Sequence, residues 1–234
     1  MAFIGFDVYG TLVDPLGMDA ALREHVGDLA ERFAATWRER QIDWTFRRAL
    51  MGRYVDFDVV TRDAFRITSA MLGVDLRTAE AGLLDTYRRL PAFADAAEGL
   101  IQLAEAGHRL VAFSNGVGAT LRGLLTHARL MPPLADVVSV DEVRTYKPSP
   151  AVYQHLVARG GESAERTWLV SSNAWDVLGA KSAGLRAAWV RRSPRMHWDG
   201  GGIAEPDVEV ASLTELPERI RRSPARTASP TRRR

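Results

Sequence analysis

The sequence predicts an α/β fold: a doubly wound, Rossmann-like parallel sheet with a helical cap domain inserted after its first strand. Three observations indicate this fold. Five short, nearly continuous apolar runs are typical of strands that are buried on both faces. Helical segments alternate with the later runs, which favours parallel strands joined by right-handed crossovers. Between the first two runs, a long stretch shows helical periodicity and no strand pattern.

The core elements follow from these runs in chain order. We expect strands at 2–6, 109–113, 137–140, 167–171 and 186–190. We expect core helices at 95–106, 117–127, 149–160 and 174–183. Gly107 and His108 supply the break between the first of these helices and the second strand.

The inserted stretch begins with an amphipathic pattern. Apolar residues recur there at spacings of three and four, at Leu22, Val26, Leu29, Phe33 and Trp37. Further helices are expected at 44–54, 60–72 and 79–89. We therefore divide the chain into a core of residues 1–14 and 96–218, a cap of residues 15–95 and a tail of residues 219–234.

The charge of the chain is unevenly distributed. The 234 residues carry 31 basic and 29 acidic side chains, but residues 219–234 hold seven arginines and no acid. Residues 1–218 are left with 24 basic and 29 acidic side chains, so the folded body is mildly acidic. The tail has almost nothing to bury, and we expect it to be disordered and solvated, with no nucleic-acid partner.

The composition also excludes several classes of site. There is no cysteine, hence no disulfide framework, no thiolate metal site and no cysteine nucleophile. No apolar run approaches the length of a membrane span, and the first residues do not have the pattern of a secretory signal. We expect a cytoplasmic protein without a membrane partner.

Polar motifs follow the predicted strands, at the edge of a parallel sheet where ligands bind. They read DVYGT (7–11), FSNG (113–116), YKPSP (146–150) and SSNAWD (171–176). Each alone has a plain structural interpretation: Asp7 can cap a turn, Ser114 can cap a helix, and Asp176 suits the first turn of a helix. Their joint placement at the ends of strands of one sheet favours a functional site.

Taken in this order, together with the helical insertion, the four motifs resemble the haloacid dehalogenase superfamily and, more narrowly, the L-2-haloacid dehalogenases. The resemblance covers nearly all of residues 1–215. It implies hydrolysis of short (S)-2-haloalkanoic acids to (R)-2-hydroxy acids and halide through an aspartyl ester on Asp7. It also implies no metal or other cofactor, a small-molecule 2-haloacid as the partner, and a homodimer.

Two positions depart from the phosphatases of the same superfamily. Those enzymes carry a second aspartate, which protonates the leaving alkoxide, at the position of Tyr9. They also carry a Mg²⁺-binding aspartate at the position of Ser172. Mg²⁺ prefers hard, charged oxygen ligands, and a halide leaving group needs no proton. Both departures therefore favour metal-free dehalogenation.

The resemblance assigns the charged roles. Asp7 attacks C2 of the substrate, Thr11 hydrogen-bonds Asp7, and Lys147 holds Asp7 ionised and oriented. Arg38, at the end of the predicted cap helix in a WR-x-x-Q pattern, receives the leaving halide. Ser171, Asn173 and Asp176 place the hydrolytic water or hold Lys147; which of them removes the proton stays open.

The resemblance also assigns substrate contacts. Ser114 and the backbone N–H of Asn115 would bind the substrate carboxylate, and the Asn115 side chain would assist with halide. Tyr153 matches a tyrosine near the nucleophile. An apolar wall around the alkyl group is expected from Tyr9, Leu12, Ile42, Phe57 and Trp175.

Two other functions compete with this interpretation. One is a Mg²⁺-dependent phosphatase of the same superfamily, against which Tyr9 and Ser172 argue. The other is a catalytically silent binding protein that kept the fold. The retained Asp7, Lys147 and Asp176 argue against it.

Overall fold

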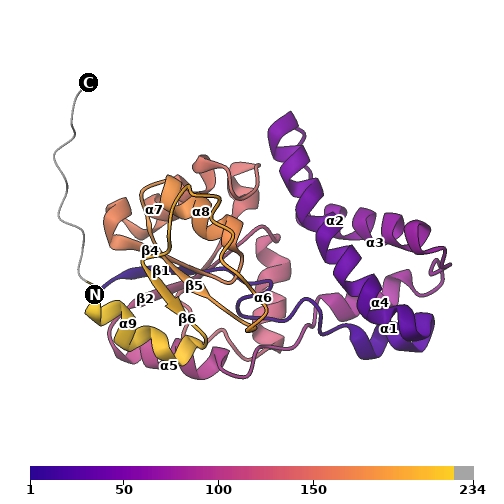
Figure 1. Ribbon diagram of the computed structural model, residues 1–234, viewed down its shortest axis with the longest axis horizontal. Coiled ribbons are helices and arrows are strands. Elements are labelled where there is room, and N and C mark those ends of the chain that lie inside the picture. Colours follow the sequence, from indigo (N-terminus) through magenta and orange to yellow (C-terminus); the bar gives the residue numbers. More distant parts are fainter. Residues whose placement is uncertain (224–234) are drawn as a thin grey trace.

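The computed structural model describes residues 1–223, which form a helix-covered sheet with a separate group of helices beside it (Figure 1). The core is a six-stranded, wholly parallel sheet with strand order β3-β2-β1-β4-β5-β6. Its strands are β1 (Phe3–Phe6), β2 (Arg109–Ser114), β3 (Asp136–Ser139), β4 (Thr167–Ser171), β5 (Arg186–Val190) and β6 (Val208–Val210). The α/β class predicted from the sequence is confirmed.

Helices cover both faces of this sheet. They are α5 (Ala96–Glu105), α6 (Gly118–His127), α7 (Pro150–Gly160), α8 (Ala174–Ser182) and α9 (Leu216–Arg222). Helices α5 and α9 contact each other on one side, and α7 and α8 lie together on the opposite side (Figure 1). Short 3₁₀ turns occupy Gly27–Leu29, Val140–Val143, Ala164–Arg166 and Leu213–Glu215.

The helices between β1 and β2 are called the cap below. They are α1 (Asp19–Val26), α2 (Ala30–Met51), α3 (Phe57–Leu72) and α4 (Glu80–Tyr87). Their aromatic centre joins α2 to α3: the Trp37 ring lies edge-on to Phe65 at 5.1 Å between centroids, and its Nε1 donates to the Thr61 carbonyl at 2.8 Å. The cap therefore has a packed interior of its own.

The cap differs from the sequence prediction in how its helices divide. The helix expected to run unbroken through residues 22–37 is interrupted at Gly27, where φ is 53°. The segment expected as a separate helix at 44–54 is instead the second half of α2. Arg38 consequently lies inside a 22-residue helix rather than at a helix end.

Two further elements were not predicted. Strand β6 has three residues with an alternating burial pattern, too short to stand out in the sequence. Helix α9 runs into the segment interpreted as tail, and Ile220 on it is buried. The tail boundary at residue 219 is therefore wrong, and the expected disorder of residues 224–234 falls outside the described residues. Within residues 1–223, no helix is both long and apolar enough to cross a membrane.

The chain leaves and re-enters the core at adjacent points. The Asp14 backbone N–H donates to the Pro91 carbonyl at 2.9 Å, and the Phe93 N–H donates to the Leu12 carbonyl at 3.0 Å. Val13 also forms an antiparallel bridge with Ala92. The cap is thus tethered by a paired connection just after the first polar motif.

Candidate active site

Asp7 lies where β1 ends and a tight turn begins. Its backbone N–H donates to Val170 of β4 at 2.9 Å, which continues the sheet by one residue. Gly10 then takes a φ of 91°, a conformation that side chains with a Cβ disfavour, and its N–H donates to Val13. The turn brings the chain back beneath Asp7, whose side chain is almost fully buried.

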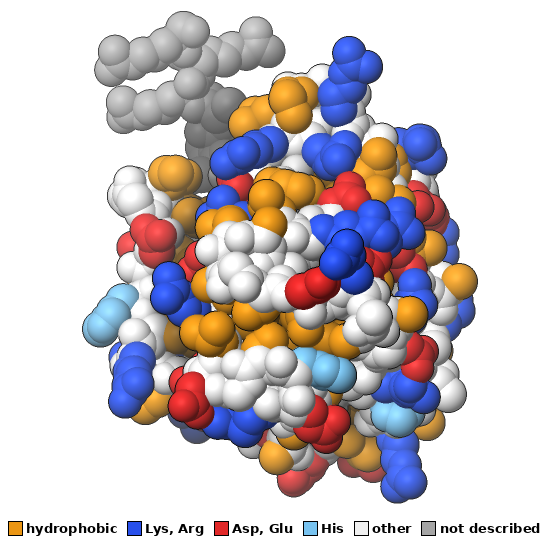
Figure 2. All heavy atoms as spheres, turned by 90° about the vertical axis from the view of Figure 1, so that its right-hand side faces the viewer, with side chains coloured by type: hydrophobic (Ala, Val, Ile, Leu, Met, Phe, Trp, Pro, Cys, Tyr) orange, Lys and Arg blue, Asp and Glu red, His pale blue; other side chains and the backbone are white. Residues whose placement is uncertain are grey.

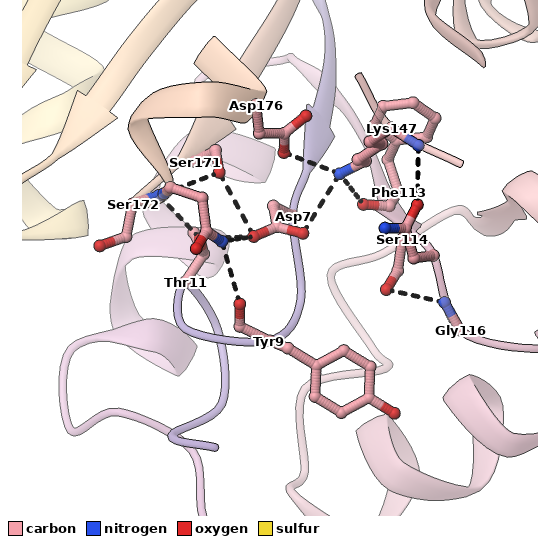
Figure 3. A network of polar contacts seen from close by, with 12 residues as sticks. Asp7, Tyr9, Thr11, Phe113, Ser114, Gly116, Lys147, Ser171, Ser172 and Asp176 are labelled. Atoms are coloured by element: carbon pink, nitrogen blue, oxygen red, sulfur yellow. Dashed lines mark hydrogen bonds and ion pairs between the residues drawn. The ribbon is translucent and has the colours of Figure 1, made fainter. Parts of the chain in front are cut away.

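One oxygen of the Asp7 carboxylate is surrounded by donors (Figure 3). Its Oδ2 accepts from Thr11 Oγ1 at 3.1 Å, Ser171 Oγ at 3.3 Å and Asn173 Nδ2 at 2.7 Å. Thr11 is itself held by the Ser172 backbone N–H at 2.8 Å. Three residues proposed from two motifs far apart in the sequence thus meet at a single atom.

The other oxygen faces Lys147. Lys147 Nζ lies 3.2 Å from Asp7 Oδ1 and 2.8 Å from Asp176 Oδ2, and it donates to the Phe113 carbonyl at 2.8 Å. The Lys147 backbone N–H also donates to Asn115 Oδ1 at 3.0 Å, which ties the lysine loop to the end of β2. Two carboxylates share one ammonium group in a fully buried setting, so its position is strongly constrained.

Asp176 is held from behind by Tyr153, whose hydroxyl donates to Asp176 Oδ1 at 2.7 Å. Burial raises the pKa of Asp176; the Lys147 ammonium opposes this shift and the Asp7 carboxylate adds to it. Burial also raises the pKa of Tyr153, so the phenol remains a hydrogen-bond donor. Tyr153, expected to contact substrate, is fully buried behind Asp176 instead, and that expectation is corrected.

A small cavity of about 10 Å³ adjoins Asp7. Cap and core residues line it together: Asp7, Tyr9, Arg38, Ile42, Thr45, Phe57, Ser114, Asn115 and Trp175. Leu12 was expected in this wall but is fully buried elsewhere and is not among the lining residues. Ser114 Oγ accepts from the Gly116 N–H at 3.2 Å, within the turn that follows β2.

Thr45 is a lining residue that the sequence analysis missed. It is buried, and its Oγ1 donates to the Ile42 carbonyl one turn earlier in α2. It lies seven residues after Arg38, on the same helical face. The periodicity would have identified it had the predicted helix continued past residue 37.

Arg38 is the cap's cation at this cavity. Its Nη2 donates to the Tyr9 carbonyl at 3.2 Å, and its guanidinium lies 5.9 Å from the centroid of the Tyr9 ring. The Tyr9 carbonyl also accepts from Asn173 at 3.2 Å. Burial raises the pKa of Tyr9 far above its usual value, so the phenol stays protonated.

The donor set around Asp7 does not fit a magnesium ion. The Ser172 hydroxyl is directed to the sulfur of Met196, at 4.0 Å, rather than to Asp7. Among residues 1–223, no three His, Cys, Asp or Glu side chains come together in a way that could hold a metal. Hard cations need several oxygen ligands, including carboxylates.

Comparison with known proteins agrees with this geometry. A family model described as haloacid dehalogenase-like hydrolase matches residues 1–184. An (S)-2-haloacid dehalogenase from Pseudomonas sp. strain YL is 36% identical over 217 residues, covering 92% of each chain. Haloacetate dehalogenase H-2 from Moraxella sp. strain B is 33% identical over 190 residues, 81% of this chain and 85% of that protein.

Solved structures are similar as well. The L-2-haloacid dehalogenase from Xanthobacter autotrophicus with chloropropionic acid covalently bound superposes with a TM-score of 0.85 at 31% identity. That match covers 95% of this chain and 99% of the other. The chain therefore belongs to the haloacid dehalogenase-like hydrolases and, within them, to the L-2-haloacid dehalogenase family.

Proposed function

We propose that this protein is an (S)-2-haloacid dehalogenase that hydrolyses the carbon–halogen bond of short 2-haloalkanoic acids through an ester on Asp7. Residues 15–95 would act as a cap over a core of residues 1–14 and 96–223. The unequal environment of the two Asp7 oxygens supports this most directly: among residues 1–223, Oδ2 accepts three hydrogen bonds, whereas Oδ1 faces only Lys147.

In the first step, Asp7 Oδ1 attacks C2 of the substrate. The new C–O bond forms as the carbon–halogen bond breaks, with inversion at C2, and the electron pair leaves with the halide. Oδ1 is suited to this role because its remaining lone pairs are not engaged by donors. Burial removes water from the carboxylate, which increases its reactivity.

In the second step, water adds to the carbonyl carbon of the ester. The negative charge then develops on Oδ2, where the Thr11, Ser171 and Asn173 donors already converge. Preorganised donors of this kind stabilise a tetrahedral intermediate. Collapse breaks the Cγ–Oδ1 bond, and Oδ1 leaves as the hydroxyl oxygen of the 2-hydroxy acid with one of the two water protons. The other water proton passes to a nearby acceptor, and the water oxygen completes the regenerated Asp7 carboxylate.

Cations offset the repulsion between Asp7, the substrate carboxylate and the departing halide. Lys147 acts on Asp7, and Arg38 reaches the cavity from the cap. We assign Arg38, with the Asn115 side chain, to halide, and Ser114 with the Asn115 backbone N–H to the substrate carboxylate. Ile42, Phe57 and Trp175 provide apolar wall for the alkyl group.

A magnesium-dependent phosphatase is the main alternative. It would need an acid for the leaving alkoxide, and Tyr9 is a poor one because burial raises its pKa. It would also need a carboxylate where Ser172 stands. A silent binding protein is disfavoured because the Asp7, Lys147 and Asp176 cluster is complete.

Halide release from (S)- and (R)-2-chloropropionate, measured with EDTA present, tests the proposal. We expect chloride from the S form only, and none from Asp7→Asn. Nitrophenyl phosphate with Mg²⁺ serves as the parallel assay. Phosphate release without chloride release would establish the phosphatase instead, and silence in both assays would favour the binding protein.

We further propose a homodimer formed through the cap. Leu50 and Met51 end the projecting helix α2 and are 89% and 62% exposed (Figure 1). Adjacent large apolar side chains left in water are typical of interaction surfaces. Sedimentation of the wild type and of Leu50→Glu would distinguish a dimer from a monomer.

A further inference from the structure

The cavity beside Asp7 is too small for a substrate in this conformation. A volume of about 10 Å³ holds at most about one water molecule, so no 2-haloacid can occupy it as it stands. A substrate therefore reaches Asp7 only when part of the wall moves. One of the residues that line the cavity must therefore separate it from a larger space.

A second pocket lies behind one of these wall residues. It has a volume of about 180 Å³ and is enclosed by α3 and α4 of the cap and by Thr120 of core helix α6. Among residues 1–223, Tyr9 alone lines both this pocket and the Asp7 cavity. Tyr9 thus forms the wall between the small Asp7 cavity and this larger pocket.

The larger space adjoins the outside. Leu84 and Arg88 line it on one side, and on the other they line an open groove of about 1100 Å³ between α3 and α4. Figure 2 looks onto this end of the cap, where hydrophobic side chains gather between charged ones. The groove and the second pocket thus share Leu84 and Arg88, and the second pocket and the Asp7 cavity share Tyr9.

The Tyr9 side chain is held by packing rather than by hydrogen bonds. Its ring lies 5.5 Å from Phe57 and 5.7 Å from Tyr87 between centroids. Arg38 and Asn173 fix its backbone carbonyl, but its hydroxyl has no hydrogen-bond partner among residues 1–223. The ring can therefore turn aside without breaking a hydrogen bond, and only its ring contacts and the long approach of the Arg38 guanidinium change.

The two guanidinium groups that line the second pocket are at most weakly paired. The Arg88 side chain is 53% exposed, and its Nη2 lies 3.6 Å from Asp58 Oδ2, beyond the range of a charge-assisted hydrogen bond. That same oxygen already accepts from Thr120 Oγ1 at 2.9 Å. Arg62, which also lines the pocket, has no ion pair within the described part of the chain.

The acids of the pocket are committed to other contacts. Asp56 caps α3 by accepting from the Val59 N–H at 2.8 Å, and Asp58 is bound to Thr120. The pocket therefore places two guanidinium groups, Arg62 without an ion pair among residues 1–223 and Arg88 in a long one with Asp58, beside carboxylates that each already accept a hydrogen bond. A planar guanidinium in this setting is suited to a small carboxylate.

We propose that this pocket is an entrance vestibule, in which Arg88 takes the carboxylate of an incoming small acid before it passes Tyr9 to Asp7. For 2-haloacids as the cargo, the inference rests on the proposed function. The vestibule itself requires only that short monocarboxylates use this route.

Arg88→Gln tests the charge, with Arg77→Gln as its matched control. Arg77 carries the same charge on the outer groove, is paired with Asp75 and does not line the vestibule. At low ionic strength we expect Arg88→Gln to lower kcat/KM for (S)-2-chloropropionate by about fivefold, with kcat little changed. Added salt should bring the wild type toward the variant, and Arg77→Gln should follow the wild type. Equal kcat/KM for the two variants overturns the proposal.

Val59→Trp tests the route. Val59 lines the vestibule, so an indole there should obstruct passage and lower kcat/KM with Arg88 intact. Ile67→Trp on the same helix, 37% exposed and lining neither pocket, is the control for the added bulk. Thermal unfolding verifies that both variants are folded. Equal kcat/KM for these two variants counts against the route.

Propionate separates this proposal from the proposed function, because it needs no turnover. Its association is followed by stopped-flow tryptophan fluorescence, since Trp175 lines the Asp7 cavity. We expect slower association in Arg88→Gln than in Arg77→Gln, even if no 2-haloacid is dehalogenated. Equal association rates, or no binding of propionate by the wild type, would overturn the vestibule.

Discussion

Tyr9 stands where a phosphatase of this superfamily needs an acid, and its hydroxyl has no hydrogen-bond partner among residues 1–223. Removing that hydroxyl should therefore have little effect on the rate of turnover. We expect Tyr9→Phe to keep kcat for (S)-2-chloropropionate within about twofold, because a halide leaves without a proton and the ring contacts remain. A loss of tenfold or more in steady-state halide release would show that the phenol takes part in the chemistry.

At the residue scale, the sequence predicted the polar half of the site better than the apolar half. Asp7, Ser171 and Asn173 follow strand ends, and parallel strands bring such positions together at one edge. Leu12 and Tyr153 were misplaced because the direction of a side chain depends on the turn or helix that carries it. Tyr153 points from α7 to Asp176 of α8, and no spacing in the sequence predicts this contact between two helices.

At the scale of elements, close approach of the backbone holds the sheet edge together. A Cβ on Gly99 of α5 would lie 2.6 Å from Leu213 Cβ and 2.8 Å from its carbonyl carbon, in the 3₁₀ turn after β6. We expect Gly99→Ala to lower the free energy of unfolding by about 1–3 kcal/mol, because the neighbouring backbone must move. Urea denaturation measures this change.

Gly123→Ala is the control for the helical propensity of alanine. Gly123 lies inside α6, is exposed, and has nothing within 4 Å of the added Cβ. It should raise the free energy of unfolding by up to about 1 kcal/mol. If both substitutions stabilised the protein, the contact between α5 and Leu213 would not be tight.

A titratable side chain, that of His108, also binds the backbone just before the first strand. His108 Nδ1 accepts from the Ala2 N–H at 3.1 Å, and burial, followed by the nearby α-amino group, lowers the pKa of His108 below 6.5. The unfolded chain then binds more protons between the two pKa values, so this stabilisation is present above pH 6.5 and is lost as the pH falls through the lowered pKa. From pH 8 to 5, the wild type should lose stability more steeply than His108→Gln. Parallel curves from urea denaturation would exclude this role.

The elements themselves were predicted unevenly, for identifiable reasons. Nearly continuous apolar runs such as β2 and β4 were found, because burial on both faces leaves a clear pattern. The junctions in the cap were not: Gly27 breaks a helix whose apolar spacing continues across it, and the buried positions that continue α2 past Trp37 are the polar Gln41 and Thr45. Strand β6 pairs only with β5, and three residues carry too little pattern to be seen.

For the molecule as a whole, the position of α9 determines where the chain can be shortened. Ile220 is buried against the core, and the Arg186 Nη1 donates to the Ser223 carbonyl at 2.7 Å. A chain ending at residue 218 should lose about 2 kcal/mol or more of unfolding free energy. A chain ending at residue 223 should keep both stability and turnover. Thermal unfolding and halide release compare the two.

The shorter tail also tests a role in nucleic-acid binding. Removal of residues 224–234 takes away four of the seven terminal arginines. We expect no salt-sensitive retention on nucleic acid by the full chain, and therefore none to be lost on shortening. Loss of such binding from the chain ending at residue 223 would assign the arginines a partner.

The paired connection at Asp14 and Pro91 joins the cap to the core at a single place, so the cap can be exchanged as a unit. Its two ends meet at one rung of hydrogen bonds, and inserted domains are tolerated where their ends lie close together. Asp7, its donors and Lys147 all belong to the core, whereas the cap contributes Arg38 and much of the apolar wall. Recombination could thus replace the cap without changing the strand order of the sheet. Descendant enzymes would then keep the Asp7 site of the core and differ in the substrates that their caps allow to bind.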